Sequence, residues 1–132
     1  MNTSFQKVRN YVLELGYTIT HENEADGILM IQDESEGIKN LLIGCADPIL
    51  IMEQFLCTLQ NPSSQVYVNL LKKNRDMVHG AFVLDEAGDK LIFRDTLQLE
   101  NLDQNELEAS INSLSLLLSE FSNEIIKYSN QQ

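Results

Sequence analysis

Residues 80–102 read GAFVLDEAGDKLIFRDTLQLENL and contain two apolar runs of strand length separated by one polar turn. The first run is AFVL, and the turn after it contains Gly88, which can adopt the positive φ of a short hairpin loop. The returning run alternates apolar with polar side chains, the period of two expected when one face of a strand meets a core. The stretch therefore predicts a β-hairpin at the centre of a small sheet.

Three segments upstream of the hairpin predict further strands. Residues 17–21 alternate β-branched or aromatic residues with polar ones, and residues 28–31 and 38–45 are apolar runs bounded by turn residues. Because residues 28–31 are apolar at every position, both faces of that strand are expected to be covered. These signals indicate a three-stranded meander before the hairpin.

Four segments carry helical signals. A capping pair, Thr3 with Gln6, marks the start of the helix predicted over residues 4–15. The segment 49–59 is preceded by Asp47, which can cap a helix with its side chain, and by Pro48, whose ring suits the first helical position. The 49–59 segment is apolar nearly all round, which predicts a helix buried on more than one side. A shorter helical segment begins at Ser63 or Ser64.

The longest predicted helix spans residues 103–128 and has apolar residues spaced by three and four. Such a stripe fits a helix laid across a sheet, and a coiled coil is the alternative. The tail after Ser129 is polar and is expected to be loose.

The order of these elements is α-β-β-β-α-(α)-β-β-α. Runs of strands, rather than strict alternation with helices, predict an α+β fold with an antiparallel β-sheet flanked by helices. A length of 132 residues suits one domain, residues 1–132, with a core that needs no disulfide or metal.

The charge balance narrows the classes of partner. Nine Lys and Arg stand against 20 Asp and Glu, a net charge of −11, which repels phosphate backbones and anionic lipid. The chain has no apolar run near the ~20 residues of a membrane span and no secretion signal at its start. These features predict a cytoplasmic protein that binds neither nucleic acid nor membrane.

The reactive side chains do not form a recognisable catalytic or metal-binding pattern. Cys45 and Cys57 lie in apolar stretches and are expected to be buried thiols, while His21 and His79 lack a second ligand at helical spacing. No phosphate loop or nucleophile elbow occurs, so no cofactor and no catalytic residue is predicted. Asp95 is interpreted as a structural carboxylate that accepts hydrogen bonds.

The chain resembles a known family in the stretches DGILMI, GIKNLLIGCADPILIMEQF and HGAFVLDEAGDKLIFRDTLQLENLDQNELEASINSLSLLLSE. These stretches, together with the length and the order of elements, look like the YbjN-like domain family. That family has the fold of the class I type III secretion chaperones, the group that includes the Tir chaperone. The resemblance covers residues 5–128. It implies a small acidic cytoplasmic protein, commonly a homodimer, that binds an extended segment of another protein without a nucleotide.

Two groups of candidate site residues follow. In the chaperones that this chain resembles, the client runs over apolar patches of the first helix and the sheet, and a flexible thioether suits such a surface. The candidate client-binding residues are Val8, Tyr11, Val12, Ile28, Met30 and Leu42. A helix at 49–59 with more than one apolar side predicts a homodimer interface. The candidate interface residues are Ile49, Ile51, Met52, Phe55 and Leu59.

Two other functions stay open from the sequence. One is a dimeric regulatory subunit that remains with one fixed partner. The other is a small ligand-binding domain or enzyme built around Arg94 and Asp95, with His79 nearby in the hairpin region. Neighbouring strand residues point to opposite faces, which disfavours the enzyme.

Overall fold

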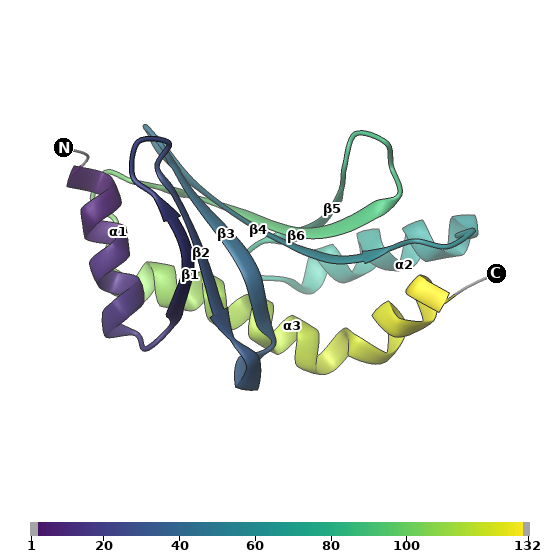
Figure 1. Cartoon of the computed structure of the whole chain (residues 1–132). Coiled ribbons are helices and arrows are strands. Elements are labelled where there is room, and N and C mark those ends of the chain that lie inside the picture. Colours follow the sequence, from purple (N-terminus) through teal and green to yellow (C-terminus); the bar gives the residue numbers. More distant parts are fainter. Residues whose placement is uncertain (1–2, 131–132) are drawn as a thin grey trace.

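Six antiparallel strands form one sheet, and three α-helices lie on the same side of it (Figure 1). The computed structural model describes residues 3–130. The strand order is β1-β2-β3-β4-β6-β5. The strands are β1 (Thr18–Asn23), β2 (Ile28–Asp33), β3 (Ile38–Ala46), β4 (Ile49–Thr58), β5 (Ala81–Leu84) and β6 (Lys90–Gln98). The helices are α1 (Thr3–Glu14), α2 (Ser64–Asp76), α3 (Gln104–Asn130) and the 3₁₀ helix η1 (Glu34–Glu36). The predicted α+β class is confirmed.

The predicted helix over residues 49–59 is wrong, because this segment is the strand β4. Asp47 and Pro48 form the turn between β3 and β4, with Ala46 paired to Ile49, instead of capping a helix. A run that is apolar at nearly every position has neither the helical nor the strand period, so pairing partners decide its conformation. Here β3 and β6 lie on either side of β4 and supply ladders for it.

The other predicted elements are confirmed with small shifts of their ends. The meander is β1, β2 and β3, and the hairpin is β5 and β6, with Gly88 at a φ of 83° in its turn. Helix α3 continues through Ser129 and Asn130, which were expected to be loose. The rest of the predicted tail, residues 131–132, lies outside the described residues.

The core lies between the helices and one face of the sheet. On β4, Leu50, Met52 and Gln54 are buried while the residues between them are not, so alternate side chains of this central strand point toward the helices. Across from them α3 buries Leu107 and Leu114. The apolar stripe of α3 therefore packs on the sheet.

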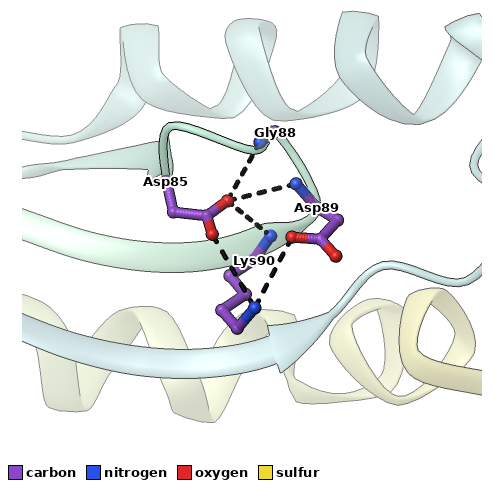
Figure 2. A network of polar contacts seen from close by, with 4 residues as sticks. All are labelled: Asp85, Gly88, Asp89 and Lys90. Carbon is purple, nitrogen blue, oxygen red and sulfur yellow. Dashed lines mark hydrogen bonds and ion pairs between the residues drawn. The ribbon is translucent and has the colours of Figure 1, made fainter.

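The turn of the β5–β6 hairpin is organised by one carboxylate (Figure 2). Oδ1 of Asp85 accepts the backbone N–H groups of Gly88 at 3.0 Å, Asp89 at 3.1 Å and Lys90 at 3.0 Å. The Lys90 ammonium lies 3.8 Å from the Asp85 carboxylate. These bonds, the one from Lys90 N–H foremost, favour the charged form and lower the pKa of Asp85. The carboxylate thus holds the polar loop in the shape that the hairpin needs.

Candidate functional site

The second face of the sheet has no helix over it within residues 3–130 (Figure 1). Its side chains are those that alternate with the buried ones, and many of them are large and apolar. We call this surface the open face. Its apolar members are Ile28, Met30, Leu42, Ile49, Ile51, Phe55, Val83 and Ile92. Phe55 has an exposed fraction of 54%, and the others are half-buried.

Cross-strand pairing joins several of these residues in two groups, which together we call the apolar band. Met30 is paired with Leu42 between β2 and β3, and Ile92 on β6 is paired with both Phe55 and Val83. Side chains directly opposite one another in an antiparallel pair lie close enough to touch. The open face therefore carries apolar surface on β2 and β3 and again on β4, β6 and β5.

An ion pair lies in the middle of the band. Glu53 on β4 and Arg94 on β6 are cross-strand partners, and Nη1 of Arg94 donates to Oε2 of Glu53. The two charges neutralise each other, so the centre of the open face has no net charge. Polar side chains, including Thr18 on β1 and Gln98 on β6, border the band.

The six predicted client-binding residues lie on two sides of the sheet. Val8 and Val12 are fully buried in the core beneath it, and the half-buried Tyr11 donates its hydroxyl to the carbonyl oxygen of Leu102 at 3.3 Å. The other three, Ile28, Met30 and Leu42, lie together on the open face. The structure therefore gathers the sheet residues of this group and separates them from the α1 residues.

The five predicted interface residues are also divided, because four of them lie on the strand β4 and Leu59 directly follows it, so none is on a helix. Ile49, Ile51 and Phe55 belong to the open face, whereas Met52 and Leu59 are buried in the core. The helical grouping of these five residues is wrong for that reason.

Sequence reasoning missed Val83 and Ile92 as members of the open face. The signal was present in the returning strand of the hairpin, where Ile92 interrupts the otherwise polar set of alternate residues. An apolar side chain among polar ones on a predicted outer face indicates that the face is not simply solvated.

Arg94 and Asp95 point to opposite faces of β6, as strand geometry requires. The Asp95 carboxylate accepts the N–H of Thr96 at 2.9 Å and the hydroxyl of the fully buried Ser110 at 2.6 Å. His79 contacts α3 through its backbone, because its carbonyl oxygen accepts a hydrogen bond from the hydroxyl of Ser113 at 2.8 Å. The interpretation of Asp95 as a hydrogen-bond acceptor is confirmed, and its bond to Ser110 ties β6 to α3.

The two cysteines are unpaired thiols. Burial, with a smaller contribution from Asp47, raises the pKa of Cys45 to about 11, and burial raises the pKa of Cys57. Within residues 3–130 there is no group of three His, Cys, Asp or Glu residues placed to hold a metal ion. None of the helices in this range has the length and apolarity needed to cross a membrane.

A comparison with protein families matches the model of the CesT_Tir_1 family over residues 1–131. Among solved structures, YbjN from E. coli superposes with a TM-score of 0.69 at 14% identity, over 91% of this chain and 92% of that one. No curated protein sequence matches the chain.

Two secretion chaperones solved with partner proteins also share the fold. SycH of Yersinia pestis, a type III secretion chaperone in complex with a fragment of YscM2, superposes with a TM-score of 0.59 at 17% identity, over 96% of this chain and 100% of that one. SchA in the HopA1-SchA chaperone-effector complex gives a TM-score of 0.63 at 11% identity, over 98% of each chain.

Proposed function

The chain belongs to the CesT_Tir_1 family of type III chaperones, and from this membership we propose that it is a non-catalytic protein that binds an extended segment of a client protein. The observation that carries the proposal is the open face. Apolar surface that extends over several strands and is bordered by polar residues is typical of a protein-binding site. The fold is shared with chaperones that were solved together with protein partners, which supports a protein as the ligand.

The charge of the chain favours one kind of client. A net charge of −11 attracts segments in which Lys or Arg flank the apolar anchors, and it repels acidic ones. The same charge disfavours nucleic acid. The client is therefore expected to be a basic, partly apolar segment, met in the cytoplasm.

We place the client on the β2–β3 half of the open face, around Met30. Met30 is paired with Leu42 and has an unbranched thioether side chain that adapts to varied partners. Replacing Met30 by Glu should lower the yield of captured clients from native lysate by about tenfold or more, because a charge would be buried in the contact. Mass spectrometry of the captured proteins is the measurement.

The matched control is Thr18→Glu, which adds the same charge to the same face but outside the apolar band. Circular dichroism establishes that both variants fold. A folded Met30→Glu protein that captures clients as well as the parent would rule out this half of the face. Many captured proteins would indicate a chaperone, whereas a single one would indicate a regulatory subunit with one fixed partner.

We also propose that the chain forms a homodimer through the β4 half of the open face, which carries Ile49, Ile51 and Phe55. Replacing Ile51 by Glu should convert the dimer to a monomer, because two copies of an unpaired carboxylate would meet across a two-fold interface. Light scattering of the parent, the Ile51→Glu variant and the Met30→Glu variant measures this. A parent protein that is monomeric at micromolar concentration would contradict the dimer.

A further inference from the structure

A groove of about 790 Å³ lies between α3 and the strands β3 and β4. One wall consists of η1 with the start of β3, and the other consists of one side of α3 from Ser115 to Ile125. Residues 54–56 of β4 complete the lining. The volume lies within the range of small-molecule sites in proteins. The groove is separate from the surface around Met30, because no residue of β2 lines it.

Hydrogen bonds within the protein fix both walls. The hydroxyl of Ser115 donates to the carbonyl oxygen of Glu36 at 2.7 Å, which fastens η1 to α3. The amide of Gln54 is buried, and its Nε2 donates to the carbonyl oxygen of Gly37 at 3.1 Å while its Oε1 accepts the N–H of Lys39 at 3.0 Å. A groove with fixed walls loses little freedom when a ligand binds, which favours affinity.

Part of the lining is apolar. Leu118 and Ile125 of α3 contribute to it, and so do Phe55 and Leu56 of β4. The register of β4 against β6 shifts between Phe55 and Cys57, so a β-bulge lies at the groove. Bulges change the direction of side chains and are frequent beside binding sites. The Phe55 ring, with an exposed fraction of 54%, thus offers an aromatic surface at the groove.

The other part of the lining is polar and has unused hydrogen-bonding groups. Among the residues that the structure describes, the side chains of four groove residues make no hydrogen bond or ion pair within the protein. These residues are Lys39, Asn40, Ser119 and Ser122. Hydroxyl and amide groups both donate and accept, and the ammonium group donates. The groove therefore combines apolar surface with donors and acceptors that are free to bind a ligand.

This combination excludes several classes of ligand. A wholly apolar ligand would cover the hydroxyl and amide groups without bonding to them, which is unfavourable. The net charge of −11 repels phosphorylated and other strongly anionic ligands. A saccharide ring is neutral, has a C–H face that packs on apolar side chains, and carries hydroxyl groups that donate and accept. Its chemistry matches both parts of the lining.

We propose that the groove binds a neutral saccharide. The C–H face of a sugar ring packs on Phe55 and Leu118, because the negative face of an aromatic ring attracts polarised C–H groups. The sugar hydroxyls bond to Asn40, Ser119 and Ser122. The inference goes beyond the proposed function, because it assigns a ligand that is not a protein.

The test is a titration of the ¹⁵N-labelled full chain, followed by two-dimensional NMR. The probes are maltotriose, cellotriose and chitotriose, three neutral sugars that differ in linkage and in substituents. At least one of them should give saturable shifts with a dissociation constant of about 1 mM or below. The largest shifts should occur at the side-chain amide of Asn40 and the backbone N–H groups of Ser119 and Ser122.

Two variants locate the site. Asn40→Gly removes the amide and keeps the backbone, because glycine adopts the φ of 53° found at this position. It should weaken binding of the sugar about fivefold, and Ser119→Ala should weaken it about threefold. The matched control is Asn61→Gly, at a φ of 44° and outside the groove, which should bind within about twofold of the parent. Phe55 is left unchanged, because it also belongs to the proposed dimer surface.

Each outcome decides the proposal. Shifts at the groove that weaken in Asn40→Gly and Ser119→Ala support it. An absence of saturable shifts with all three sugars at about 20 mM overturns it. Shifts confined to the open face, or equal affinity of the parent and both groove variants, overturn it as well. The capture experiment with Met30→Glu does not depend on the groove, so the proposed function is decided separately.

Discussion

Replacing Leu114 by Ala is expected to lower the free energy of unfolding by about 3 to 5 kcal/mol. Leu114 is fully buried at the middle of α3, where the helix packs on the sheet. Truncation removes apolar burial and leaves a cavity that neighbours on a rigid sheet cannot close. Urea unfolding of the parent and the variant measures the difference.

Two other positions on α3 serve as controls. Leu118 is only half-buried, so Leu118→Ala should cost about 1 to 2 kcal/mol. Asn112 is exposed, and Asn112→Ala should change stability by no more than about 0.5 kcal/mol. Similar losses at all three positions would contradict the packing of α3 described above.

Replacing Gly80 by Ala is expected to cost about 2 to 5 kcal/mol of stability, because two separate effects add. Gly80 has a φ of 80°, in the left-handed region that L-residues disfavour. An added Cβ would also overlap the ring of Phe93, which is fully buried and has no room to move, and would lie 3.2 Å from the carbonyl oxygen of Arg94. Thermal and urea unfolding give the size of the effect.

Gly88 separates the conformational effect from the steric one. Its φ of 83° is nearly the same, but nothing lies within 4 Å of a Cβ added there. Gly88→Ala should therefore cost only about 1 to 2 kcal/mol. If the two alanine variants were equally stable, the close approach between Gly80 and Phe93 would not matter energetically.

The local elements could be read from the sequence wherever the apolar period was clear. The alternation in β6 and the turn at Gly88 defined the hairpin, and the three-and-four spacing in α3 defined the long helix. The segment of β4 could not be read in this way. Its run of apolar residues has no period, and the turn at Asp47 and Pro48 resembles a helix start in sequence.

The candidate site was predicted only in part, because the sequence identifies apolar residues but not the face of the sheet on which they lie. Strand signals correctly placed Ile28, Met30 and Leu42 on apolar strands, but the sequence does not say which face of the sheet α1 covers. The structure puts Val8 and Val12 under the other face, in the core. Ile51 joins the open face only because β4 is a strand.

The sequence by itself determined the α+β class, the hairpin, the meander and the amphipathic helices α1 and α3, because each depends on residues close together in the chain. Only the tertiary structure decided that β4 is a strand, that the helices lie on one side of the sheet and that β3 diverges from β4 at Glu53. These features depend on pairing and packing between distant segments. Local spacing carries no information about which segment supplies the partner.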